Sequence, residues 1–206
     1  MTAIKLTYFD MHGGRGEPVR IALHAAGVSF DDERLSFKDF FAMRSSTPLD
    51  AVPVMTVDGT DYTQSNSMLR YVGRQAGLYP DDSWQAFLCD EIMDVTEDLL
   101  HQVVATFGLE GDALKTARQS LVEGGITRYL KLVDTRLTAA GGRYLAGNQL
   151  TVADLKTFIQ LRAFAAGVLD HVPTDICDTL APSVAAYGQR IGEEPIVTAY
   201  YASLSG

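Results

Sequence analysis

Tyr8 is the side chain in this sequence whose position first suggests chemistry. It ends an apolar run that starts at Ile4, and a glycine-rich loop with the sequence GGRG follows at residues 13–16. A tyrosine hydroxyl is a hydrogen-bond donor that can stabilise an anion, and α/β sheets commonly form ligand crevices where strands end. In isolation, a tyrosine in such a run is more often an ordinary core residue. The loop and the helix start that follows it favour a binding role.

A second polar group occupies Gln64 and Ser65, where a helical pattern begins. The start of a helix has free backbone N–H groups and the positive end of the helix dipole, which together suit a carboxylate. Ser65 can also act simply as the helix N-cap, and it can do both. Shortly before, Pro53 interrupts an apolar strand. A proline there is typical of a sheet edge, and most X–Pro bonds are trans.

The cysteines and histidines argue against redox and metal chemistry. Cys89 and Cys177 are far apart and form no CxxC motif, so we expect two buried structural thiols rather than a disulfide or a zinc site. The four histidines show no ligand spacing, and no metal is expected. Disulfide exchange would need a thiol near residues 10–16, where the sequence has none.

The charge balance argues against one class of partner. The formal net charge is −9 and the sequence pI is about 4.8, whereas a general nucleic-acid binder needs clustered Lys and Arg. The start MTAIKLTYFD lacks the basic and apolar regions of a signal peptide, and no run approaches the roughly 18 apolar residues of a membrane span. We expect a cytoplasmic protein without nucleic-acid or membrane partners.

Alternating segment types predict an α/β domain with a mixed sheet at the start of the chain. Pro18 suits the first turn of a helix and Gly27 suits the position just after its end, so a helix is expected between the first two strands. Asp58 and Gly59 are typical of a tight hairpin turn. The expected strands cover residues 4–8, 30–35, 53–57 and 60–62.

From Ser65 onward the apolar residues recur at helical intervals. The first such helix stops near Gly77, and residues 78–83 read as a connection between domains. A later helix starts with a capping box at Thr151 and Asp154, whose loss would cost about 1 kcal/mol. Further helical stretches are expected at residues 88–103, 114–138 and 152–166.

Four sequence segments together resemble the cytosolic glutathione transferases over nearly the whole chain. They are KLTYFDMHGGRGEPVR at 5–20, VPV at 52–54, TQSNSMLRY at 63–71 and LTVADL at 150–155. The first segment is most like the sigma class, which includes glutathione-dependent prostaglandin D synthases. The resemblance implies a thioredoxin-like α/β domain with a mixed sheet at residues 1–79, followed by an all-α domain at residues 85–206.

The resemblance also implies a glutathione site without a metal. In the family, a tyrosine matching Tyr8 stabilises the thiolate and an arginine matching Arg15 supports it. The residue before a cis proline, here Val52 before Pro53, pairs with the backbone of the glutathione cysteine. A glutamine and a serine at the start of a helix hold the γ-glutamyl carboxylate in the family, and they match Gln64 and Ser65.

The residues expected to bind the glycyl end of glutathione differ from those of the family. Sigma enzymes hold it with a tryptophan and a lysine, and the matching positions are Phe40 and Arg44. Arginine can bind the glycyl carboxylate, whereas phenylalanine has no N–H to donate. A second family lysine is replaced by Ala51.

The helical domain carries the implied dimer contact and electrophile pocket. An aspartate matching Asp98 reaches the ammonium of glutathione bound by the other subunit, which implies a homodimer. The pocket is expected between Tyr8 and the helical domain, and four residues are expected to line it: His101, Gln102, Ala105 and Phe107.

The predicted function is that of a cytoplasmic, detoxifying glutathione transferase whose thiolate attacks small, mostly apolar electrophiles. Two alternatives stay open. One is a glutathione-dependent isomerase of the prostaglandin D synthase type, which does not consume glutathione. The other is a non-catalytic structural relative, favoured by the replacements at Phe40 and Ala51 and disfavoured by the presence of Tyr8, Gln64 and Ser65.

Overall fold

The computed structural model describes residues 3–204, which form two compact units. The first unit comprises residues 3–79 together with residues 195–204, and the second comprises residues 80–194. The expected second domain, residues 85–206, extended to the end of the chain. The last helix instead groups with the first unit, because it packs on the first helix of that unit.

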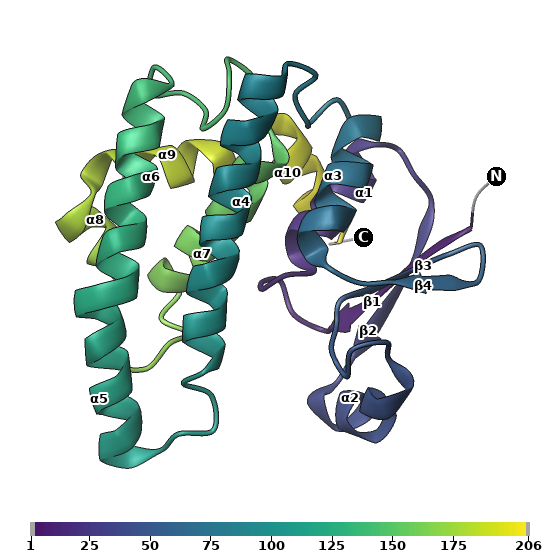
Figure 1. The fold of residues 1–206 in the computed structure, drawn as a ribbon, viewed down its shortest axis with the longest axis horizontal. Coiled ribbons are helices and arrows are strands. Elements are labelled where there is room, and N and C mark those ends of the chain that lie inside the picture. The colour runs from purple at the N-terminus through teal and green to yellow at the C-terminus, as the bar shows by residue number, and fades with distance from the viewer. Residues whose placement is uncertain (1–2, 205–206) are drawn as a thin grey trace. The chain divides into compact units, whose positions relative to one another are not determined.

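The first unit contains a four-stranded sheet in the order β2-β1-β3-β4 (Figure 1). β1 runs parallel to β2 and antiparallel to β3, and β3 pairs antiparallel with β4, so the predicted mixed sheet is confirmed. Figure 1 shows α1 beside α3, with α2 on the other side of the sheet. The elements are β1 (Ile4–Phe9), α1 (Glu17–Ala25), β2 (Phe30–Leu35), α2 (Phe37–Met43), β3 (Val54–Val57), β4 (Thr60–Tyr62), α3 (Ser65–Gln75) and α10 (Pro195–Ser203).

Helix α2 was not predicted, although the sequence contains a signal for it. Ser36 is its N-cap and accepts the Asp39 N–H at 3.1 Å, while the Ser36 hydroxyl donates to the Asp39 carboxylate at 2.6 Å. A serine followed three residues later by an acid is typical of a helix start. The helix is short and leaves two phenylalanine rings exposed, so its apolar pattern does not mark one buried face.

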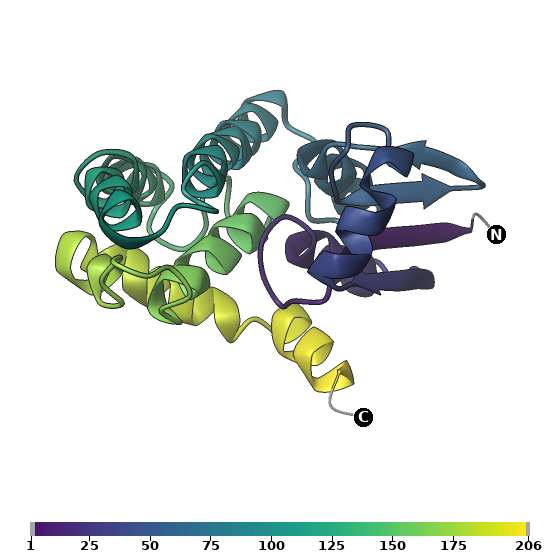
Figure 2. The same cartoon turned by 90° about the horizontal axis from the view of Figure 1, so that it is seen from below.

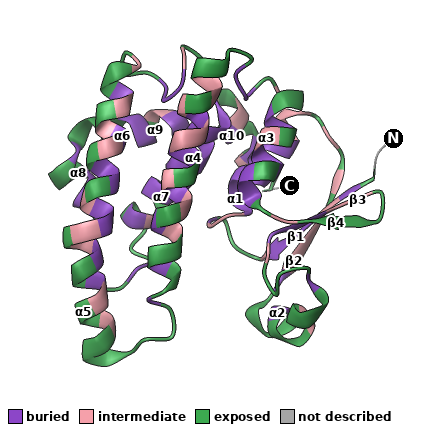
Figure 3. Cartoon of the chain, viewed as in Figure 1, coloured by how far each residue is buried: buried purple, intermediate pink, exposed green. Residues whose placement is uncertain are grey.

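The second unit is entirely helical, as predicted. In Figure 2 the green α7 lies between α4 and the yellow α9, and it contacts both. Figure 3 shows α7 in purple along most of its length, because nearly all of its residues are buried. The helices are α4 (Ser83–Val104), α5 (Gly111–Leu121), α6 (Thr127–Ala139), α7 (Val152–Ala165), α8 (Ile176–Leu180) and α9 (Pro182–Gly192).

The helix expected at residues 114–138 is present but is interrupted. A π-helical segment, Val122–Ile126, joins α5 to α6. Gly125 in this segment lies so close to α4 that a Cβ atom there would overlap Oε1 of Gln102. The glycine therefore permits a close approach between the two helices.

The predicted capping box at the start of α7 is confirmed. The Asp154 carboxylate accepts the Thr151 N–H at 2.7 Å and the Thr151 hydroxyl at 2.8 Å. Both cysteines are free and buried, as expected. Burial raises the pKa of the Cys89 thiol to about 12 and that of Cys177 to about 11, so both stay protonated and unreactive near neutral pH.

Candidate functional site

The strand register brings the candidate residues of the first unit to one end of the sheet, where β1 and β2 finish and β3 begins. Thr7 pairs with Val54 at the start of β3, so the next residue of β1, Tyr8, lies near Pro53. β4 runs back to the same end and leads into α3, where Gln64 and Ser65 lie. β2 ends there too, since it is parallel to β1, and α2 follows it. The carboxyl end of β1 is therefore close to the first residues of three elements: β3, α3 and α2.

The glycine-rich loop is folded around the Tyr8 ring. Tyr8 is only 5% exposed, and its hydroxyl oxygen accepts the Arg15 N–H at 3.0 Å. A Cβ atom on Gly14 would overlap the hydroxyl oxygen, and one on Gly16 would overlap the ring itself. Gly14 also has a φ of +61°, in the left-handed region that favours glycine. The loop thus determines where the hydroxyl lies.

Arg20 holds the chain on both sides of this loop and was missed by the sequence analysis. Its side chain is fully buried, and its guanidinium donates to the Phe9 carbonyl at 3.2 Å and to the Met11 carbonyl at 3.0 Å. It also pairs with Asp32 at 2.8 Å and with Glu17 at 3.3 Å. The visible signal was a Glu17 and Arg20 pair, one helical turn apart, in an otherwise apolar helix start.

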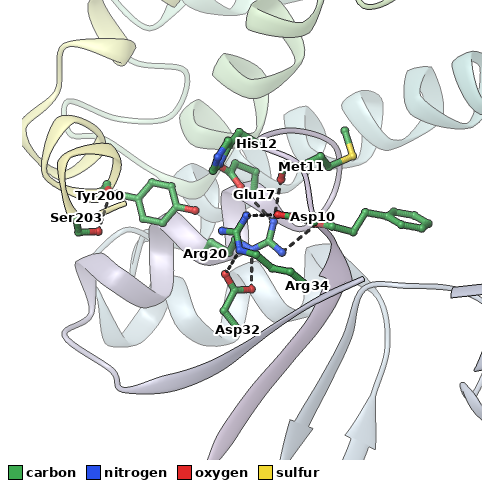
Figure 4. A network of polar contacts seen from close by, with 10 residues as sticks. Asp10, Met11, His12, Glu17, Arg20, Asp32, Arg34, Tyr200 and Ser203 are labelled. Atoms are coloured by element: carbon green, nitrogen blue, oxygen red, sulfur yellow. Dashed lines mark hydrogen bonds and ion pairs between the residues drawn. The ribbon is translucent and has the colours of Figure 1, made fainter. Parts of the chain in front are cut away.

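A second arginine extends this network toward the last helix. Arg34 donates to Asp32 at 2.8 Å and to Asp10 at 3.3 Å. Burial opposes its charge, but Asp32 and Asp10 together raise the pKa of Arg34. Burial also raises the pKa of the neighbouring Tyr200. Figure 4 shows these groups gathered between β2, α1 and α10, and charged side chains of β2 and α1 hold the end of β1.

The Val52–Pro53 peptide bond is cis, as the resemblance implied. Pro53 is buried, while Val52 is half-buried and immediately precedes β3. Ala51 is exposed, and its N–H donates to the Thr47 hydroxyl at 2.9 Å. The β1–β3 pairing ends at Val54, so the backbone of Val52 lies just beyond the paired part of the sheet.

The structure corrects one alternative at the start of α3. Gln64 is the N-cap and Ser65 the first helical residue, so Ser65 is not the N-cap. Gln64 has a φ of +73°, a left-handed conformation that is costly for a residue other than glycine, and its side chain makes no capping hydrogen bond. Ser65 is 5% exposed. The first N–H groups of α3 are thus not capped by the Gln64 side chain and can bind an anion.

Phe40 and Arg44 have different surroundings. Phe40 is 9% exposed and its ring lies 5.1 Å from that of Phe9, so it packs against the end of β1. Arg44 is exposed, and its Nε donates to the Asp50 carbonyl at 2.9 Å. The exposed phenylalanines of α2 are instead Phe37 and Phe41.

The candidate residues of the second unit lie along the end of α4 and the loop that follows. His101 approaches Glu97 at 3.6 Å, a charged pair only when the histidine is protonated. The Gln102 amide donates to the Asp98 carbonyl at 3.3 Å and lies against Gly125. The side chains predicted to line the electrophile pocket or to reach the other subunit are exposed: Asp98, His101, Gln102, Ala105 and Phe107.

Among residues 3–204, no group of three or more His, Cys, Asp or Glu side chains could hold a metal ion. None of the helices in the same range is long and apolar enough to cross a membrane.

Sequence comparison matches both halves of the chain to one family. The family model described as "Glutathione S-transferase, N-terminal domain" matches residues 4–74, and "Glutathione S-transferase, C-terminal domain" matches residues 97–204. The chain is 35% identical to "Glutathione S-transferase 1" of Ascaris suum, over 75% of this chain and 77% of that protein. It is 31% identical to "Glutathione S-transferase 3" of Caenorhabditis elegans, over the same shares.

Solved structures are similar over the whole length. A prostaglandin synthase D of Nilaparvata lugens is 27% identical with a TM-score of 0.85, covering 97% of both chains. The glutathione S-transferase from Ascaris lumbricoides is 29% identical with a TM-score of 0.79, covering 98% of this chain and 97% of that one.

Proposed function

This chain belongs to the glutathione S-transferase family, and we propose that Tyr8 holds the thiol of bound glutathione as the reactive thiolate. The observation that carries the proposal is the Tyr8 hydroxyl, whose oxygen accepts the Arg15 N–H, a hydrogen bond that fixes the hydroxyl without using its proton. Lowering a thiol pKa of about 8.5 by two units requires about 2.7 kcal/mol. A hydrogen bond to an anion contributes roughly 1.5–3 kcal/mol, enough to supply much of this.

Glutathione is the substrate, and we propose that the residues around Tyr8 hold its three parts. The Val52 N–H and C=O pair with the backbone of the glutathione cysteine, as a further strand would. Ser65 and the uncapped start of α3 take the γ-glutamyl carboxylate, with Gln64 beside it. Arg44 binds the glycyl carboxylate. Phe40 packs against the ring of Phe9 at the end of β1.

The test is a titration of bound glutathione, followed by the ultraviolet absorbance of the thiolate. We expect the thiol to titrate well below its pKa in free glutathione, because Tyr8 and its neighbours stabilise the anion. Glutathione that does not bind, or that binds with an unshifted thiol, would overturn the proposal. It would favour the non-catalytic alternative instead.

Replacing Gly16 with alanine is expected to lower kcat/KM for a chlorodinitrobenzene electrophile by at least about tenfold. The backbone of Gly16 has a φ of −82°, which alanine adopts freely, so the added methyl acts only by displacing the Tyr8 ring. A misplacement near 1 Å can reduce a rate by about 10²-fold.

The matched control for Gly16 is Gly13→Ala. Its added Cβ would meet only the terminal methyl of Met11, at 3.3 Å, and that flexible side chain can move away. The Gly13 variant should keep its activity. Equal losses in both variants would show that the loop tolerates no substitution, rather than that Gly16 positions Tyr8.

One comparison favours a second candidate function. Because the chain is similar to a prostaglandin synthase D of Nilaparvata lugens, a sigma-like glutathione-dependent isomerase is a reasonable alternative. Mass spectrometry of the product distinguishes the two activities, since a conjugate retains glutathione and an isomer does not. The electrophile site is proposed at His101, Gln102, Ala105 and Phe107 in either case.

We further propose a homodimer in which Asp98 reaches glutathione bound by the other chain. Asp98 is exposed on α4. A groove of about 680 Å³ on the first unit, lined in part by Met55, Tyr62 and Tyr71, offers a partner an apolar surface. Light scattering should give the mass of two chains, and a single-chain mass would overturn the proposal. Cytoplasmic location stays a prediction.

A further inference from the structure

His12 and Glu17 meet across the glycine-rich loop that surrounds Tyr8. The two residues stand immediately before and immediately after the GGRG segment at 13–16. Nδ1 of His12 lies 3.1 Å from Oε1 of Glu17, and Figure 4 shows the two side chains next to each other. A carboxylate accepts hydrogen bonds and has none to donate, so Nδ1 carries the proton in this contact. The His12–Glu17 hydrogen bond therefore joins the two ends of the loop.

The Glu17 carboxylate depends on this hydrogen bond because solvent does not reach it. The side chain of Glu17 is 0% exposed, whereas that of His12 is 48% exposed. Among the residues that the structure describes, two side chains contact the carboxylate: Arg20 donates to Oε2 at 3.3 Å, and His12 donates to Oε1. A buried acceptor that loses its donor is costly, so the folded chain favours the closed loop.

Arg20 fixes only the part of the chain that comes before the loop. Its guanidinium donates to the carbonyls of Phe9 and Met11. Beyond Met11, three of the four residues at 13–16 are glycine, and Gly14 has a φ of +61°. Glycine loses more conformational freedom on folding than any other residue. This segment therefore needs contacts at its own ends, and the His12–Glu17 hydrogen bond provides one that spans both.

The closed segment carries the hydrogen bond that fixes the Tyr8 hydroxyl. The Arg15 N–H donates to that oxygen at 3.0 Å, and Arg15 lies between His12 and Glu17 in the chain. Gly16, where a Cβ atom would overlap the Tyr8 ring, directly precedes Glu17. Opening the loop at His12 would let the Arg15 N–H and the Gly16 backbone move away from the tyrosine.

We propose that His12 is a positioning residue, which keeps the Arg15 N–H on the Tyr8 hydroxyl by holding the loop closed against Glu17. The inference rests on the proposed function for its effect on catalysis, because Tyr8 is the residue proposed to hold the glutathione thiolate. His12 acts through Glu17 and the loop rather than on the substrate.

The first experiment measures hydrogen exchange of the Arg15 amide by NMR in the protein without glutathione. It compares the wild type with His12→Ala and His12→Asn. Asparagine carries its N–H donors on Cγ, the atom that bears Nδ1 in histidine, so it can still donate to Glu17. Exchange should be at least about tenfold faster in His12→Ala, because losing one hydrogen bond to a charged group favours local opening by about that factor. His12→Asn should exchange at nearly the wild-type rate.

His24→Ala is the matched control. The rings of His24 and His12 both lie against tyrosines of α10, with centroids 5.8 Å from Tyr200 and 6.1 Å from Tyr201 respectively. His24 lies in the last turn of α1, at the opposite end of that helix from Glu17. Its loss removes a comparable ring contact and leaves the loop closed, so Arg15 exchange should not change.

Three results would overturn the proposal. Unchanged exchange in His12→Ala would show that the loop stays closed without the hydrogen bond. Equal acceleration in His12→Ala and His24→Ala would assign the effect to lost contact with α10. Exchange as fast in His12→Asn as in His12→Ala would show that a donor at this position does not close the loop. If His12→Ala does not fold, His12→Leu, which fills the space without a donor, takes its place in the comparison.

The second experiment tests the effect on catalysis. His12→Ala should raise the pKa of the bound glutathione thiol by less than Tyr8→Phe does, because the hydroxyl is still present and only its position is loosened. We expect kcat to fall about 3–10-fold and KM for glutathione to change by less than about twofold, since a misplaced group slows the reaction more than it weakens binding. His12→Asn should restore both the thiol pKa and kcat.

The two experiments separate this inference from the proposed function. Faster Arg15 exchange with an unchanged thiol pKa and kcat in His12→Ala would overturn the positioning role of His12. An unshifted glutathione thiol in the wild type would refute the proposed function instead. Arg15 exchange is measured without glutathione, so it would still decide whether His12 closes the loop.

Discussion

Replacing Tyr8 with phenylalanine is expected to raise the pKa of the bound glutathione thiol by about 1–2 units, the equivalent of one hydrogen bond to an anion. Turnover near neutral pH should fall about 10–100-fold, because the fraction of glutathione present as thiolate falls with that shift. The ring that Gly16 and Arg20 pack against is kept in this variant, so folding should be unaffected. Thiolate absorbance against pH measures the first effect, and steady-state kinetics measure the second.

Tyr62→Phe is the control for this substitution. Tyr62 is 51% exposed and lies at the end of β4, so loss of its hydroxyl should leave the thiol pKa unchanged. The proposed mechanism fails if Tyr8→Phe leaves the thiol pKa where it is in the wild type. In that case the anion would be stabilised by Arg15 or by backbone N–H groups instead.

Replacing Asp154 with alanine is expected to lower the free energy of unfolding by roughly 3–5 kcal/mol, the largest stability effect of any substitution considered. Four donors depend on its carboxylate. The Leu145 N–H and the Tyr187 hydroxyl donate to Oδ1 at 2.9 and 2.7 Å, and the N–H and hydroxyl of Thr151 donate to Oδ2. All four bonds are buried, so alanine leaves donors that water cannot reach. Urea denaturation measures the change.

A graded series tests the explanation. Asp154→Asn keeps one acceptor oxygen and should lose about half as much stability, because one pair of donors then faces an NH₂ group. Asp112→Ala is the control, since Asp112 is an exposed acid in the first turn of α5 and contributes only through the helix dipole, about 0.3–1 kcal/mol. Similar losses for Asp112 and Asp154 would refute the role given to the buried hydrogen bonds.

The two largest effects arise in different ways. Tyr8 acts on the substrate and its loss should leave the fold intact, whereas Asp154 lies within the second unit and acts on folding alone. Measuring stability and thiol pKa in both variants therefore separates loss of function from loss of structure.

Local sequence patterns determined much of the fold. Two strands, Phe30–Leu35 and Thr60–Tyr62, begin and end where the sequence predicted, because turn residues bound them. The capping box of α7 was also predictable, since it involves residues only three apart. Tyr8, Gln64 and Ser65 could be named as candidates from their places at the end of a strand and the start of a helix, whereas Val52 and Pro53 were named through the resemblance to the family.

The sequence by itself determined the types of these elements and the short motifs, because both depend on neighbours along the chain. The tertiary structure alone decided which distant groups meet. Packing closes the loop so tightly on Tyr8 that only glycine fits at positions 14 and 16. The last helix, α10, packs on α1 from the start of the chain, and no local sequence pattern predicts this contact. Folding brings the carboxylates of Glu17 and Asp32 to the buried Arg20, and only the folded chain determines the surroundings of a charge.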